Sequence, residues 1–152
     1  MYTYFIADDE TKIRQGIRRL IDWETLGFSF IGEASNGEDA LRFILDKNPD
    51  VTLLDIRMPR LSGLDVARLV RADGYRGIII ILSGYSDFKY AQEAMRYDVK
   101  YYISKPVDED ELTDYLKKVT DELSVREKHT SAIEYFSEKA RDGILSDVLT
   151  GS

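Results

Sequence analysis

Two nearly continuous apolar runs, VTLLDI at Val51–Ile56 and GIIIIL at Gly77–Leu82, decide the fold that this sequence favours. A strand with one face in water alternates apolar and polar residues, whereas a parallel strand covered on both faces is apolar throughout. Three other segments have strand-like composition: Tyr2–Ala7, Phe28–Ala34 and Val99–Ser104. The sequence therefore predicts five strands, with the two apolar runs at the centre of a parallel sheet.

Amphipathic segments lie between and after these strands, with apolar residues at helical spacing. Short crossovers between parallel strands are right-handed, so the helices cover both faces of an open, doubly wound α/β sheet. In such a sheet, ligands bind at the carboxyl ends of the strands. The predicted helices cover Ile13–Ile21, Ala40–Leu45, Leu64–Val70, Phe88–Met95 and Leu112–Leu123.

Composition excludes several classes of protein. The 152-residue chain has no cysteine, so a disulfide framework and a thiolate metal site are both excluded. It contains no apolar run near the roughly 20 residues that span a bilayer, and no signal-peptide pattern, so we expect a cytoplasmic location. Its net charge of −7 argues against direct binding of nucleic acid by this chain.

Chemically reactive side chains follow four of the predicted strands. Asp8 and Asp9 end the first strand, Asp55 the third, Ser83 the fourth and Lys105 the fifth. Each has an ordinary explanation by itself, such as a helix cap, a turn or a surface lysine. Their shared position at the carboxyl ends of parallel strands instead predicts a single site.

Crowded carboxylates without histidine or cysteine suit a hard divalent cation, and Mg²⁺ accepts carboxylates, waters and a phosphate oxygen. A carboxylate beside Mg²⁺ can attack a phosphoryl group and form an acyl phosphate. The cation, a lysine and a hydroxyl would stabilise the charge on the transferring oxygens. The residues therefore predict phosphoryl-transfer chemistry with Mg²⁺.

Four motifs, ADDE, LLDIRMPRLSG, ILSGY and YYISKP, occur in this order and resemble the receiver domain of bacterial two-component response regulators. The resemblance runs from about Tyr2 to about Leu123. It implies a flavodoxin-like, five-stranded sheet of order 2-1-3-4-5. It also implies that a sensor histidine kinase phosphorylates Asp55, with Mg²⁺ bound by Asp8, Asp9, Asp55 and the backbone carbonyl of Arg57.

The resemblance assigns further roles near the phosphoacceptor. Lys105 would contact the phosphoryl group, and the Lys105–Pro106 bond resembles the family's cis peptide. Ser83 and Tyr102 occupy the two switch positions, and Arg57 and Tyr85 the positions that tune phosphoryl lifetime. The output would appear on the face formed by the fourth helix, fifth strand and fifth helix, where a homodimer is one expected partner.

The extended link within Ile21–Leu41 is similar to receivers joined to AraC-type helix-turn-helix domains. We therefore expect a receiver at residues 1–124 and a helical linker at 125–152, with DNA binding in a domain outside this chain. Ser131 and Glu134 form a capping box that predicts a new helix start in the linker. The linker's apolar stripe, at Ile133, Phe136, Ala140, Ile144 and Val148, is a second candidate homodimer contact.

Other functions stay open at this stage. A stand-alone or degenerate receiver would serve only protein contacts. A Mg²⁺-dependent phosphatase of the haloacid dehalogenase kind would need a second aspartate where Arg57 stands. A flavodoxin-like cofactor module would place a phosphate beside Asp8, Asp9 and Glu10, which repel it. We therefore expect a phosphoacceptor signalling domain that is not an enzyme.

Overall fold

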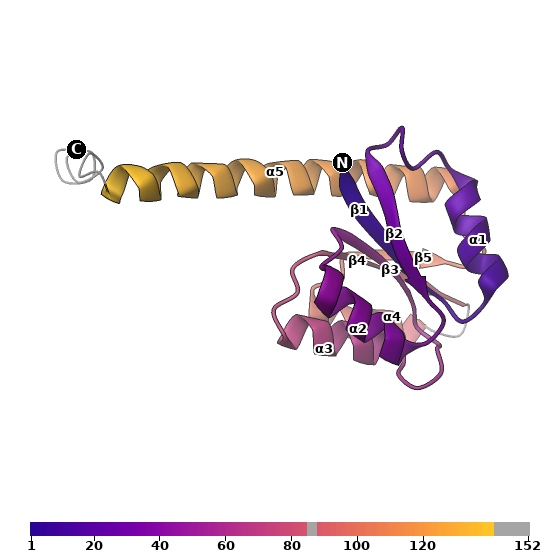
Figure 1. Ribbon diagram of the computed structural model, residues 1–152. Coiled ribbons are helices and arrows are strands. Elements are labelled where there is room, and N and C mark those ends of the chain that lie inside the picture. Colours follow the sequence, from indigo (N-terminus) through magenta and orange to yellow (C-terminus); the bar gives the residue numbers. More distant parts are fainter. Residues whose placement is uncertain (85–87, 142–152) are drawn as a thin grey trace. The chain divides into compact units, whose positions relative to one another are not determined.

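The computed structural model describes residues 1–84 and 88–141 and contains one parallel sheet with helices on both faces (Figure 1). The strand order is β2-β1-β3-β4-β5, which confirms the predicted doubly wound topology. The strands are β1 Tyr2–Ala7, β2 Phe28–Ala34, β3 Val51–Asp55, β4 Ile78–Ser83 and β5 Tyr101–Ser104. The helices are α1 Thr11–Leu20, α2 Gly37–Lys47, α3 Gly63–Ala72, α4 Phe88–Ala94, the 3-10 turn η1 Met95–Tyr97, and α5 Glu109–Arg141.

The two central strands are covered on both faces, as their continuous apolar sequences predict. Every residue of β3 and β4 is buried. The first two strands match the predicted ranges, β3 ends one residue earlier than predicted, and β4 begins and ends one residue later. The fifth strand begins at Tyr101 and not at Val99, because its pairing with β4 starts at the Ile80–Tyr101 pair.

Figure 1 shows α2, α3 and α4 on one face of the sheet and α1 on the other. Two of these helices, α2 and α3, have side-chain hydrogen bonds at their ends. The side chain of Asn36 accepts from the Asp39 N–H at the start of α2, and Ser62 accepts from the Asp65 N–H at the start of α3. Arg71, near the end of α3, donates to the carbonyls of Tyr97 and Tyr75. These contacts fix the ends of the helices beside the sheet.

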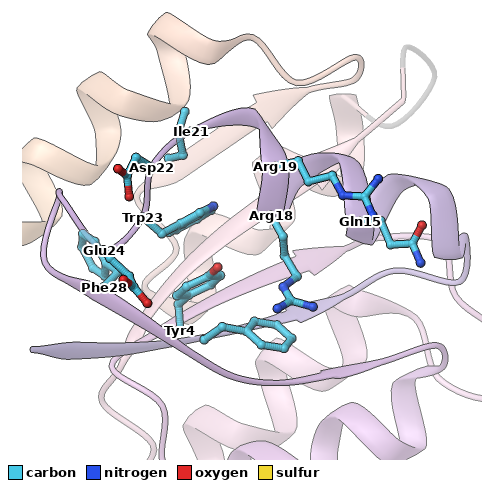
Figure 2. A pocket seen from close by; sticks show the side chains of 10 residues that line it. Tyr4, Gln15, Arg18, Arg19, Ile21, Asp22, Trp23, Glu24 and Phe28 are labelled. Carbon is cyan, nitrogen blue, oxygen red and sulfur yellow. The ribbon is translucent and has the colours of Figure 1, made fainter.

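Trp23 packs the extended α1–β2 link onto the sheet (Figure 2). Its indole is 4% exposed and stacks on Tyr4 with ring centroids 3.9 Å apart. The indole Nε1 donates to the Ile17 carbonyl at 3.1 Å, so its polar group is satisfied inside the domain. Beside it, the guanidinium of Arg18 lies over the Phe30 ring. The link is therefore a structural part of the domain.

The expected helix start at Ser131 is wrong. Residues Glu109–Arg141 form one continuous α-helix, in which Ser131 is an interior position. A capping box works only where the chain enters a helix from an extended backbone, and no such entry exists here. The expected stripe residues Ile144 and Val148 lie outside the described residues.

The chain divides into two compact units, Met1–Leu116 and Lys117–Ser152, with the boundary inside α5. In the first unit, Leu112 and Leu116 are fully buried. In the second, Val125, Ile133 and Phe136 are exposed although apolar. Within the described parts of the chain, no helix combines the length and apolar character needed to cross a membrane.

Candidate functional site

The carboxyl ends of β1 and β3 bring three acidic side chains together. One carboxylate oxygen from each of Asp8, Asp9 and Asp55 lies within 4.8 Å of the others. Asp8 and Asp55 are buried, with 0% and 4% exposure, whereas Asp9 is exposed. This pairing follows from the register, because β1 and β3 are adjacent and parallel. Oxygen ligands from two or three carboxylates suit Mg²⁺, and the exposed Asp9 leaves a side open to water.

Neither Asp8 nor Asp9 caps α1. The N-cap position is Glu10, which has no side-chain capping bond. Asp8 Oδ1 instead accepts from the Glu10 backbone N–H at 2.9 Å, and the Asp8 N–H donates to the Ala34 carbonyl at 3.1 Å. The ordinary capping explanation of these acids is therefore wrong, and their carboxylates face the end of β3.

The start of α3 packs tightly against the segment that carries Asp55. The Gly63 N–H donates to the Ile56 carbonyl at 2.7 Å, and a β-carbon built at Gly63 would collide with the Asp55 carbonyl. Only glycine permits this approach. The last residue of β3 is thus held between β4, whose Leu82 is its register partner, and the first turn of α3.

Burial and the neighbouring acids destabilise the ionised form of Asp55. Burial, followed by repulsion from Asp8, raises the pKa of Asp55 from 3.8 to about 6, against an opposing attraction from Lys105. Burial alone lowers the pKa of Lys105, but hydrogen bonding and attraction from Asp8 and Asp55 outweigh it and raise that pKa. A cation placed among the three carboxylates relieves the repulsion that raises the pKa of Asp55.

Lys105 reaches the acids from the end of β5. Its Nζ lies 2.8 Å from Asp8 Oδ2 and 3.2 Å from Asp55 Oδ1. The Lys105 backbone N–H donates to the Ser83 carbonyl at 2.7 Å, which fixes the strand end. The Lys105–Pro106 peptide is cis. The ammonium therefore lies where it can pair with an anion bound at Asp55.

Ser83 and Tyr102 are neighbours across β4 and β5. The Ser83 hydroxyl, fully buried, donates to the Tyr102 hydroxyl. Ser83 is one residue beyond the register partner of Asp55, so it lies at the same sheet edge. The structure therefore places the two predicted switch residues in direct contact with each other.

Of the two residues at the positions predicted to tune phosphoryl lifetime, the structure describes Arg57 but not Tyr85. Arg57 follows β3 with an exposed side chain, and it lines a hollow of about 750 Å³ together with Asp9, Met58 and Tyr90. Tyr85 lies outside the described residues. On α4, part of the expected output face, Tyr90 is 46% exposed.

Sequence reasoning missed Arg14. This α1 residue is 8% exposed and donates from Nη1 to the Asp8 carbonyl at 2.6 Å. A signal was present, because Arg14 and Ile17 are three residues apart and therefore share the buried face of the helix. An arginine on that face needs partners, which the helical pattern alone does not identify.

Comparisons with known proteins agree with this geometry. The family model described as the response regulator receiver domain matches residues 4–117. The uncharacterized transcriptional regulatory protein YesN of Bacillus subtilis is 40% identical over 129 residues. The match includes 85% of this chain but only 35% of that protein, so the chain spans about a third of the relative's length.

Solved structures show the same fold. The receiver domain of AraT, a response regulator from Geobacillus stearothermophilus, aligns with a TM-score of 0.79 at 37% identity, over 83% of this chain and 98% of that one. The two-component transcriptional regulator AraC from Clostridium phytofermentans aligns with a TM-score of 0.72 at 33% identity, over 80% of this chain and 94% of that one.

Proposed function

The chain belongs to the response regulator receiver domain family of two-component signalling, and on that premise we propose that Asp55 is its phosphoacceptor. The observation that carries the proposal is the contact of Asp55 with Lys105 at the end of β3, within 4.8 Å of two further carboxylates. Asp8 also contacts Lys105, at 2.8 Å, but its other carboxylate oxygen accepts from the Glu10 N–H. Asp55, the last residue of the central strand β3, therefore supports the acceptor role better than Asp8 does.

The chain's own residues can perform the transfer. Above a pH of about 6 the Asp55 carboxylate is mostly ionised and is a competent nucleophile. One of its oxygens would attack phosphorus, and the bond from phosphorus to the donor nitrogen or oxygen would break with its electron pair leaving on the donor. Lys105 would stabilise the transferred phosphoryl oxygens. Bound Mg²⁺ would supply further positive charge to those oxygens.

The donor set fits Mg²⁺. Asp8, Asp9 and Asp55 would hold it, with the Arg57 backbone carbonyl as a further oxygen ligand. Hydrolysis of the acyl phosphate would return the domain to its starting state, so the chemistry is limited to the domain's own phosphoryl group. Ser83 and Tyr102, already in contact, would change position together when Asp55 is phosphorylated.

A sensor histidine kinase is the proposed donor, acting in the cytoplasm. An almost entirely apolar hollow of about 500 Å³ lies directly beside Lys105, lined by Ile13, Leu20 and Pro106 among others. Such a hollow accepts apolar side chains of a protein donor while the acid site receives the phosphoryl group. Small donors such as acetyl phosphate do not need it.

Relatives named as transcriptional regulators support an output in transcription. We propose that a DNA-binding domain outside this chain supplies that output and that this acidic chain does not bind DNA itself. Self-association of the chain would connect phosphorylation of Asp55 with DNA binding by that domain. The contact would be the face of α4, β5 and α5 or the tail. The tail helix exposes Val125, Ile133 and Phe136, whose spacing places them on one side of the helix.

Intact mass after incubation with acetyl phosphate and Mg²⁺ tests the acceptor. The parent should gain one phosphoryl group, and Asp55→Asn or chelation of Mg²⁺ should abolish the gain. If the parent neither gains the group nor binds a beryllofluoride phosphoryl mimic, the chain is a degenerate receiver used for protein contacts. Turnover of an external phosphate ester would instead support a phosphatase.

The rate of phosphoryl transfer from a phosphorylated histidine kinase tests whether the apolar hollow beside Lys105 contacts the kinase. Ile13→Glu should slow transfer from the kinase and leave labelling by acetyl phosphate unchanged, because it adds charge to the apolar hollow only. Leu45→Glu is the matched control, since Leu45 is an exposed leucine on α2. Equal effects of both variants would refute the assignment of this surface.

Sedimentation at several concentrations, with and without beryllofluoride, tests self-association. Phe136→Lys should shift a dimer toward monomer if the tail is the contact. A dimer that withstands this change but dissociates in Tyr90→Lys would assign the contact to the face of α4, β5 and α5.

A further inference from the structure

We infer that Arg14 is a positioning residue for the metal-binding acids: its guanidinium fixes the peptide group between Asp8 and Asp9 so that both carboxylates face one cation. The inference rests on the proposed Mg²⁺ site and adds to it a residue that is not a ligand. The observation that carries it is the hydrogen bond from the buried Arg14 guanidinium to the Asp8 carbonyl, in the backbone segment that bears both acids.

Burial sets Arg14 apart from the other arginines of its helix. It is 8% exposed, whereas Arg18 and Arg19 are exposed. An arginine is seldom buried this completely without charged or hydrogen-bonding partners, because removing its charge from water is costly. Its position therefore depends on the groups that it contacts.

Those groups belong to three different elements. Nη1 donates to the Asp8 carbonyl at the end of β1, at 2.6 Å. Nη2 donates to Thr11 Oγ1 at the start of α1, at 3.2 Å. Nε lies 3.4 Å from Glu33 Oε1 on the edge strand β2, which makes an ion pair without a hydrogen bond. The planar fork thus joins β1, α1 and β2 beneath the acid cluster.

The Asp8 carbonyl is the atom that matters for the site. It belongs to the planar peptide that leads into Asp9, so fixing this oxygen also fixes the orientation of the Asp9 N–H. The Asp8 N–H is already held by Ala34, and Asp8 Oδ1 by the Glu10 N–H. Asp9 is exposed, so the backbone that Arg14 holds is the part of Asp9 that the fold orients toward the site.

A charge effect and a positioning effect predict different results for lysine. An ammonium keeps the positive charge near the carboxylates but cannot reach the Asp8 carbonyl, Thr11 and Glu33 with one rigid plane. If Arg14 acted only through its charge, Arg14→Met would tighten Mg²⁺ binding by removing a nearby positive charge, and Arg14→Lys would leave the affinity unchanged. If it acts through geometry, lysine fails nearly as completely as a neutral residue.

Calorimetric titration of the apo chain with Mg²⁺ separates these cases. The variants are Arg14→Met, Arg14→Lys and, as a matched control for the lost charge, Arg19→Met in the same helix. We expect both Arg14 variants to raise the Mg²⁺ dissociation constant by about tenfold or more, as loss of a residue that orients metal ligands does. Arg19→Met should leave it nearly unchanged. At saturating Mg²⁺, labelling by acetyl phosphate should return toward the parent rate.

Urea unfolding in EDTA, run in parallel, reports whether each variant folds. If Arg14→Met does not fold, the Mg²⁺ dissociation constant of Arg14→Lys, which keeps the charge, still distinguishes geometry from charge. An unchanged dissociation constant in folded Arg14→Met, or full recovery in Arg14→Lys, overturns the inference. A parent chain that binds no Mg²⁺ overturns the proposed Mg²⁺ site itself, so the two failures are distinguishable.

Discussion

Replacing Asp55 with asparagine should stabilise the metal-free domain. Asp55 is buried beside Asp8, and burial and repulsion together raise its pKa from 3.8 to about 6. The folded state therefore binds a proton more tightly than the unfolded chain does. The contribution of Asp55 to stability is greatest below pH 3.8 and is lost as the pH rises to about 6, because the folded domain must then accept an unfavourable charge at this site.

The magnitude follows from the size of the shift. A rise from 3.8 to about 6 is close to two pH units, and at 1.36 kcal/mol per unit the ionised group costs about 3 kcal/mol at neutral pH. The attraction of Lys105 is already included in that pKa. Asparagine has nearly the same shape without the charge, so Asp55→Asn should recover most of this free energy.

Urea unfolding in EDTA at pH 7.5 and at pH 4 is the assay. Asp55→Asn should unfold with a free energy about 3 kcal/mol above the parent at pH 7.5 and close to the parent at pH 4. Asp46→Asn, at an exposed site on α2, is the control and should change little. Saturating Mg²⁺ in place of EDTA should reduce the difference in unfolding free energy between Asp55→Asn and the parent, because Mg²⁺ stabilises the parent. An equal or lower stability of Asp55→Asn at pH 7.5 would refute the electrostatic account.

Four other predictions concern packing, the tail helix and the metal. Gly63→Ala should destabilise the domain by roughly 3 kcal/mol, because its β-carbon meets the Asp55 carbonyl, and urea midpoints would show it. Trp23→Ala should cost about 3–5 kcal/mol in the same assay, with Trp23→Phe milder. Ala132→Pro separates two structures of the tail. It should lower helical circular dichroism if the helix is continuous, but not if a helix begins at Ser131, since proline is favoured at the first helical position. Chelation of Mg²⁺ should lower the parent's melting temperature at pH 7.5.

Much of the fold and the location of the site follow from local patterns. Continuous apolar sequence marked β3 and β4 as central strands, and the acids at strand ends marked the edge where they meet. These predictions succeed because the central strands of any open parallel α/β sheet are buried on both faces. The carboxyl ends of those strands also lie at one edge of the sheet. The tail shows the limit of local pattern, since Ser131 carries a capping signal inside a continuous helix. A capping signal is weak when helix propagation on both sides is favourable.

The sequence by itself determined the strands, their order once the family was recognised, and the presence of a carboxylate cluster with a lysine. Only the tertiary structure decided that Arg14 lies beneath that cluster, and that Asp8 is fully buried while Asp9 is exposed. It also decided how closely Gly63 approaches Asp55. The reason is physical: helical periodicity tells which face of α1 is buried, but the partners of a buried guanidinium come from β1 and β2, whose distances are set only when the sheet is assembled.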